Sequence, residues 1–193
     1  MSAPGDDSAL SPPERLAVAY APRAFRPLWE GFLLLDQRLA AATRAGRDPL
    51  MIQLRLAWWR DRFASPASEW PAGEPLLALL KPWDTQRAAL RAMVDGWEAR
   101  IVGEDGGAKL GEARIEALMA LAHLCHAPAD DSVRRAAAEW LGMQSPSTRP
   151  PILPAMLRPL AILRGIALRE ASGKAASPLG NLLAILRIGA FGR

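Results

Sequence analysis

The stretch that decides the fold of this chain is DPLMIQLRLAWWRD, residues 48–61. It begins like a helix, because Asp48 can accept hydrogen bonds from the first free N–H groups and Pro49 stands where its missing N–H costs nothing. A helix that is apolar nearly all round packs between other helices, so the pattern predicts a helix inside a bundle. The apolar residues form two stripes, one with Met51, Leu54 and Trp58 and the other with Ile52, Leu56, Trp59 and Phe63.

Four polar residues interrupt this apolar segment: Gln53, Arg55, Arg60 and Asp61. A polar group inside a protein needs a hydrogen-bond partner, and inward-facing polar groups are how helical bundles build ligand pockets. Two interpretations follow. Either these side chains line a pocket, or Gln53 and Arg60, which are seven residues apart, share a solvated edge.

The composition of the 193-residue chain indicates an all-α protein. Half of the residues are hydrophobic, which is typical of a globular domain, and helix formers such as Ala, Leu, Arg and Glu dominate. Strand signals are weak, because the chain has a single Tyr, few Val or Thr and no sustained alternation of apolar and polar residues. We therefore predict one helical bundle.

Charge and cysteine content restrict the function classes. The chain has 24 Lys plus Arg against 20 Asp plus Glu, and these basic residues, nearly all Arg, are scattered. A nucleic-acid-binding protein would show a dense basic patch, so we expect no nucleic-acid partner. The single Cys125 excludes an internal disulfide. With no apolar leader and no long uncharged apolar span, the sequence predicts a cytoplasmic protein.

Capping and helix-breaking residues divide the chain into elements. We expect a disordered tail over residues 1–10 and one helical domain over residues 11–193. Asp84 is expected to cap a long helix and Gly46 to end another. The expected helices cover residues 11–20, 27–45, 48–64, 84–102, 112–126 and 130–141, and two more at 156–171 and 178–191 follow a loop at 145–151.

Three residues near the end of one expected helix resemble metal ligands: His123, Cys125 and His126. The two histidines lie one helical turn apart, but Cys125 projects elsewhere and no second Cys/His pair completes a tetrahedral site. We interpret them as a helix C-terminus, where imidazolium is favoured.

Three segments, in this order, resemble the squalene/phytoene synthase family. They are FLLLD at 32–36, QLRLAWWR at 53–60 and MVDGWE at 93–98, and the resemblance runs from about Glu14 to the C-terminus. The tail resembles the short, non-carotenogenic branch, which is similar to a mitochondrial complex I assembly factor of this fold. The resemblance implies a truncated, single-domain helical bundle of the isoprenoid synthase type.

Active members of this family join two prenyl diphosphates and hold Mg²⁺ with paired aspartates on facing helices. At the place of the first motif this chain has Ala40, Ala41 and Arg44, and an acidic position after Asp95 is replaced by Arg100. The region of the second motif, residues 130–141, is rich in Arg and Ala. Because guanidinium repels a divalent cation, we expect neither Mg²⁺ nor another cofactor, and no catalytic residues.

What remains of the family pattern predicts a vestigial cleft. We expect Asp36 to form an ion pair with Arg60 inside it. Asp95 and Glu98, three positions apart, fit either an acid/base pair or an edge that is solvated or paired with arginine, and the missing second base favours the edge. The expected cleft residues are Asp36, Arg44, Gln53, Arg55, Trp59, Arg60, Asp95, Glu98 and Arg100.

Two hypotheses on function remain. The first, which we favour, is a catalytically inactive scaffold that binds a protein partner. By the resemblance, this partner is a respiratory complex I subunit. The Arg-bearing apolar helices after residue 151 fit either peripheral contact with the inner membrane or, as we favour, ordinary bundle helices that bury these apolar faces. The second is a prenyltransferase or isoprenoid-binding protein, in which a diphosphate is held without Mg²⁺ by Arg44, Arg55, Arg60 and Arg100.

Overall fold

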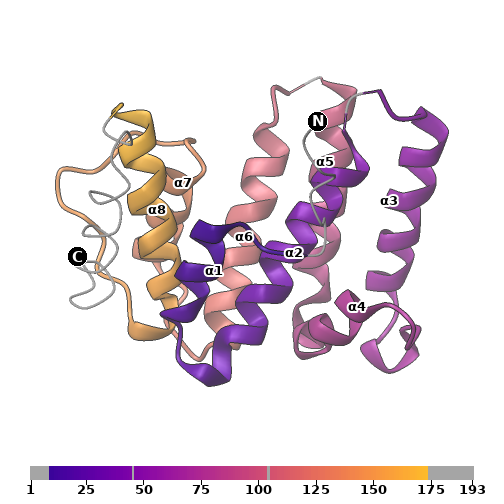
Figure 1. Ribbon diagram of the computed structural model, residues 1–193, viewed down its shortest axis with the longest axis horizontal. Coiled ribbons are helices and arrows are strands. Elements are labelled where there is room, and N and C mark those ends of the chain that lie inside the picture. The colour runs from indigo at the N-terminus through magenta and orange to yellow at the C-terminus, as the bar shows by residue number, and fades with distance from the viewer. Residues whose placement is uncertain (1–8, 45, 104, 174–193) are drawn as a thin grey trace. The chain divides into compact units, whose positions relative to one another are not determined.

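The computed structural model describes residues 9–44, 46–103 and 105–173 (Figure 1). Within these ranges all regular secondary structure is helical, which confirms the predicted all-α class. The predicted helix at 178–191 and most of the predicted tail at 1–10 lie outside the described residues. No helix in the described ranges combines the length and the apolar character needed to cross a lipid bilayer.

The chain forms two compact units. Of the described residues, unit 1 consists of 9–10, 30–44, 46–103 and 105–117, and unit 2 of 11–29 and 118–173. Helices α2 (Arg26–Ala42) and α6 (Ala108–Leu124) each contribute residues to both units. All nine cleft residues expected from the sequence therefore belong to unit 1.

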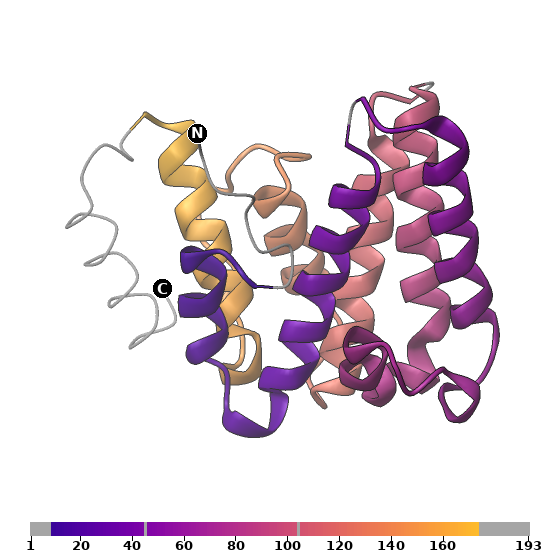
Figure 2. The ribbon, with the colours of Figure 1, turned by 45° about the vertical axis from the view of Figure 1, so that its right-hand side comes forward.

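Unit 1 is built on α3 (Pro49–Ala64) and α5 (Arg87–Val102), which pack along each other. Figures 1 and 2 show α3 at the outer edge of this unit, with α5 beside it. The chain between them forms the short α4 (Pro75–Leu80) and two 3-10 helices. The core combines aliphatic and aromatic side chains, and within it the Phe32 ring is stacked 6.4 Å from that of Trp83.

The close approach of α5 and α6 depends on a glycine. A Cβ atom at Gly96 would lie 2.9 Å from the Cα atom of Leu110 and 3.2 Å from the Cβ atom of Ala113. Real Cβ atoms do not come this close to a backbone atom, so a larger residue would push α6 away. The glycine in the VDGWE segment is therefore required by helix packing.

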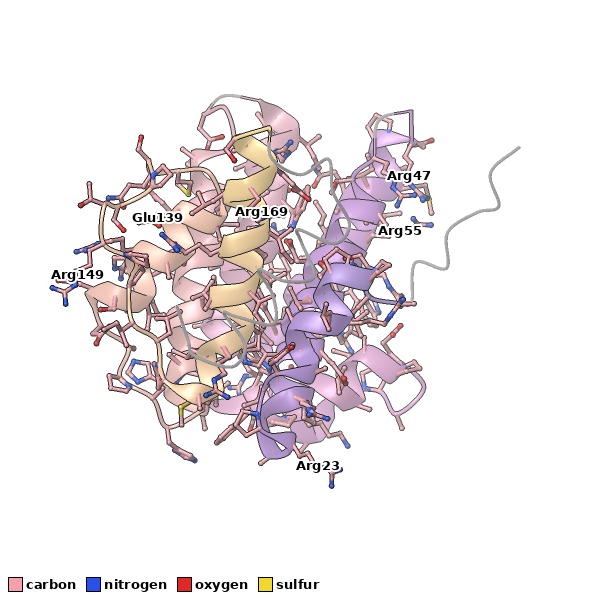
Figure 3. All side chains as sticks on the ribbon, turned by 60° about the vertical axis from the view of Figure 1, so that its left-hand side comes forward. Arg23, Arg47, Arg55, Glu139, Arg149 and Arg169 are labelled. Carbon is pink, nitrogen blue, oxygen red and sulfur yellow. The ribbon has the colours of Figure 1, made fainter. Side chains whose placement is uncertain are left out.

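Unit 2 contains α1 (Pro12–Ala19), α7 (Asp131–Trp140) and α8 (Arg158–Ala171), and α8 packs against both other helices. Helix α1 begins with a capping box formed by Ser11 and Glu14. Glu139 is almost fully buried on α7 (Figure 3) and accepts hydrogen bonds from Arg164 Nε at 2.5 Å and from the Ser147 amide at 3.0 Å. Arginine thus compensates the buried charge.

The structure corrects one prediction about α3. The stripe of Ile52, Leu56, Trp59 and Phe63 is buried against the unit 1 core, as a bundle helix requires. The other stripe faces solvent, and the exposed fractions of its side chains are 47% for Met51, 55% for Leu54 and 37% for Trp58. The prediction that α3 packs between helices on several faces is therefore wrong, because neighbouring elements cover only one face.

Three predicted helix boundaries are also wrong. Asp84 does not cap α5, because it lies in the 3-10 helix Lys81–Gln86, where its carboxylate accepts from the Ala67 amide at 2.8 Å and pairs with Arg87. Helix α2 ends at Ala42, before Gly46. Its last turn is closed by the Thr43 hydroxyl, which donates to the Leu39 carbonyl at 3.0 Å. Helix α6 starts at Ala108, four positions before the predicted start.

Candidate functional site

An arginine on α3 binds two carboxylates on α5. Arg60 Nε donates to Asp95 Oδ1 at 2.7 Å, and its Nη2 donates to Glu98 Oε2 at 2.5 Å. The hydrogen bond to Asp95 and the charges of both carboxylates raise the pKa of Arg60. Asp95 keeps half of its side chain exposed. The interpretation of Asp95 and Glu98 as a solvated, arginine-paired edge is confirmed.

The predicted ion pair between Asp36 and Arg60 is wrong. Asp36 instead accepts two hydrogen bonds from Arg114 on α6, at 3.0 Å from Nε and 2.7 Å from Nη2. Trp97 Nε1 donates a third at 2.9 Å, and the Arg114 guanidinium lies 5.1 Å from the centre of the Trp97 ring. The donors of Arg60 are directed to α5, so Arg114 takes the carboxylate that Arg60 was expected to bind.

A cavity of about 440 Å³ lies between the end of α2 and the neighbouring face of α3. Its cationic side chains are Arg38, Arg47 and Arg55, and Figure 3 shows Arg47 and Arg55 close to each other. Glu74 is the acidic lining residue, 3.9 Å from Arg38. The wall is completed by Trp58 and Trp59, packed edge to face at 4.8 Å, and by Ala41 and Ala42.

The nine residues of the predicted cleft thus separate into different places. Asp95, Glu98 and Arg60 form one group, Asp36 belongs to a second group with Arg114, and Arg55 and Trp59 line the cavity. The other three, Arg44, Gln53 and Arg100, are exposed. The Arg100 guanidinium lies 5.8 Å from the centre of the Trp97 ring. The pocket interpretation of α3 therefore holds for Arg55 and fails for Gln53.

Sequence reasoning missed Arg114, Arg38, Arg47 and Glu74. Arg114 lies outside the motifs that carry the family resemblance, and its pairing with Asp36 spans 78 positions of the chain. The sequence did contain one signal for the cavity. Arg38, Arg47 and Arg55 lie in and around the turn between two predicted helices. A helical hairpin brings such positions together at one end, so a cationic cluster could have been predicted there.

The residues that resembled metal ligands lie at the end of α6 and directly after it. Cys125 is fully buried, and burial raises the pKa of its thiol to about 12. His126 has a φ of +55° and contacts Phe25 edge to face, with ring centres 6.3 Å apart. Across the described ranges, no three His, Cys, Asp or Glu side chains gather closely enough to hold a metal ion.

Comparisons of this chain with protein-family models, with curated proteins and with solved structures found no match. The chemistry of the site is therefore inferred from its own geometry. The two groups of carboxylates are bound by guanidinium groups, which donate to both oxygens of Asp36 and to one oxygen each of Asp95 and Glu98. The cavity presents cationic and aromatic side chains, a combination that suits an anion with an apolar part.

Proposed function

We propose that the protein is a catalytically inactive helical scaffold of the squalene/phytoene synthase type, which binds a protein partner. The observation that carries this proposal is that Asp36, Asp95 and Glu98 are each bound by an arginine. A Mg²⁺ ion that activates a diphosphate needs several free carboxylate oxygens around it. In this chain, binding the ion would require breaking ion pairs that already neutralise most of that charge.

The resemblance to the assembly-factor branch suggests which partner to test. We expect the scaffold to bind a subunit of respiratory complex I at the inner membrane. The test is a deletion strain in which the level and activity of complex I are measured, followed by capture of the subunits with the tagged, full-length protein. The proposal predicts reduced complex I that the wild-type gene restores, and co-purification of a complex I subunit. Normal complex I in the deletion strain would contradict this partner.

The cavity favours one second candidate function, the binding of a prenyl diphosphate without Mg²⁺. Within the described part of the chain, no carboxylate pairs with the guanidinium of Arg47 or of Arg55. Both groups can therefore donate bidentate hydrogen bonds to a diphosphate. The indole rings of Trp58 and Trp59 offer an apolar surface for the prenyl chain of the ligand.

Isothermal titration with farnesyl diphosphate in EDTA tests this candidate. We expect saturable binding that Arg55→Ala weakens about tenfold or more, because a charge-assisted hydrogen bond to phosphate contributes about 1.5–3 kcal/mol. The matched control is Arg91→Ala on the exposed side of α5, which should leave the affinity unchanged. No heat at millimolar ligand, or equal binding by both variants, would exclude the cavity as the site.

A further inference from the structure

The outward face of α3 is apolar in the middle and carries opposite charges at its two ends. The exposed fractions are 67% for Leu50, 55% for Leu54 and 37% for Trp58. Arg47 precedes the helix and Asp61 lies in its last turn, and both are exposed. In the part of the chain that the structure describes, neither side chain has an ion-pair partner. We name this surface the α3 seam; it consists of Arg47, Leu50, Met51, Leu54, Trp58 and Asp61.

We propose that the α3 seam binds the α3 seam of a second copy of this chain, in an antiparallel pair with its two-fold axis at Leu54. The spacing supports a helix pair. Arg47, Leu54 and Asp61 follow one another at intervals of seven residues, and large apolar side chains stand between them. An interval of seven with intermediate apolar positions is the repeat by which two helices pack along their length.

The charge pattern selects the second copy and its direction. Positions equally far before and after Leu54 meet in an antiparallel pair, so Leu50 faces Trp58 of the second copy, and Arg47 faces Asp61. Each contact occurs twice, as an isologous interface requires. A parallel pair would place Arg47 against Arg47 and Asp61 against Asp61, and like charges in contact are unfavourable.

The position of α3 leaves the seam open to another molecule. Helix α3 lies at the outer edge of unit 1, with its buried face toward α5 (Figures 1 and 2). A 16-residue helix is about 24 Å long, and a pair of such helices buries less surface than a standard interface of about 800 Å² per partner. We therefore expect a reversible dimer with a micromolar dissociation constant. The inference does not rest on the proposed scaffold function, although two seam residues, Arg47 and Trp58, also line the cavity.

The test is sedimentation velocity on the full chain over a concentration series. We expect Leu54→Glu to give monomer at every concentration, because it places two carboxylates on the axis. Arg47→Asp and Asp61→Arg should each raise the dissociation constant about tenfold, since two attractive pairs become repulsive. The double variant with both changes exchanges the charges and should return the dissociation constant to within about threefold of the wild type.

Arg91→Asp is the matched control, because it makes the same charge change at an exposed position of α5. It should leave dimerisation unchanged, and circular dichroism of every variant should show an unaltered helix content. Three results would overturn the proposal. The first is that the wild-type chain stays monomeric into the millimolar range. The second is that the double variant dimerises no better than the single variants. The third is that the chain is monomeric and its seam binds lipid vesicles instead.

Discussion

At the residue scale, arginine decides what the carboxylates of unit 1 can do. Asp36 accepts three hydrogen bonds, two from Arg114 and one from Trp97. Asp95 and Glu98 share Arg60. The sequence indicated an arginine-paired edge at Asp95, because no histidine or second base accompanies it. It could not identify the partner of Asp36, since an ion pair between distant segments has no local signal.

Removing the partner of Asp36 should destabilise the protein. The Asp36 side chain is 22% exposed, so Arg114→Met leaves a mostly buried carboxylate with a single donor. We expect the free energy of unfolding in urea to fall by about 1–3 kcal/mol. Asp36→Asn in the Arg114→Met background should recover part of this loss, because it removes the uncompensated charge. Unchanged stability of Arg114→Met would show that the pair is only a surface contact.

A second prediction at this scale concerns pH. The hydrogen bond from the Ala67 amide, and then the pairing with Arg87, hold the pKa of Asp84 below its ordinary value of 3.8. A lowered folded-state pKa stabilises the protein above the unfolded-state pKa, and this contribution disappears as the pH falls through the folded-state value. Asp84→Asn should therefore be less stable than the wild type at pH 7, and the difference should shrink as the pH falls below 3.8 and through the lowered folded-state pKa of Asp84.

Urea denaturation at several pH values checks this, with Asp131→Asn as the control because Asp131 is an exposed carboxylate at the first position of α7. A constant difference between Asp84→Asn and the wild type down to pH 2 would contradict the prediction.

At the scale of elements, the start of α3 could be predicted and its orientation could not. Asp48 accepts from the Leu50 and Met51 amides and Pro49 begins the helix, so the boundary was encoded locally. Both apolar stripes of α3 have similar composition, and only the neighbouring elements determine which one is buried. A distant partner also explains why Asp84 does not cap α5. Its carboxylate accepts from the Ala67 amide and so is not available to the first N–H groups of the helix.

The close packing of α5 against α6 predicts that a larger residue at Gly96 destabilises the protein. Ala has the higher helix propensity by about 1 kcal/mol, but a Cβ atom at Gly96 would lie 2.9 Å from the Leu110 Cα atom. Because backbone cannot yield as a side chain can, Gly96→Ala should lower the free energy of unfolding by about 1–3 kcal/mol.

The control is Gly73→Ala, where a Cβ atom would meet nothing within 4 Å. It should change the free energy of unfolding by less than about 0.5 kcal/mol. If Gly96→Ala is as stable as Gly73→Ala, the close approach of α5 and α6 is not required for the fold.

At the scale of the whole molecule, composition was sufficient for the fold class. The chain is rich in Ala, Leu, Arg and Glu with few β-branched residues, and all regular secondary structure in its described ranges is helical. The division into two units was not predicted, because α2 and α6 continue through the boundary and no linker marks it. The expected single-domain bundle of the isoprenoid synthase type stays a proposal.

The central claim is that the carboxylates left in unit 1 serve ion pairs with arginine and do not hold a catalytic metal. Its most direct test is to incubate the full chain with labelled farnesyl and geranylgeranyl diphosphate and excess Mg²⁺, and to analyse the products. We predict no diphosphate release and no prenyl product above a protein-free control. Turnover of either substrate that depends on Mg²⁺ and on Asp95 would contradict the account.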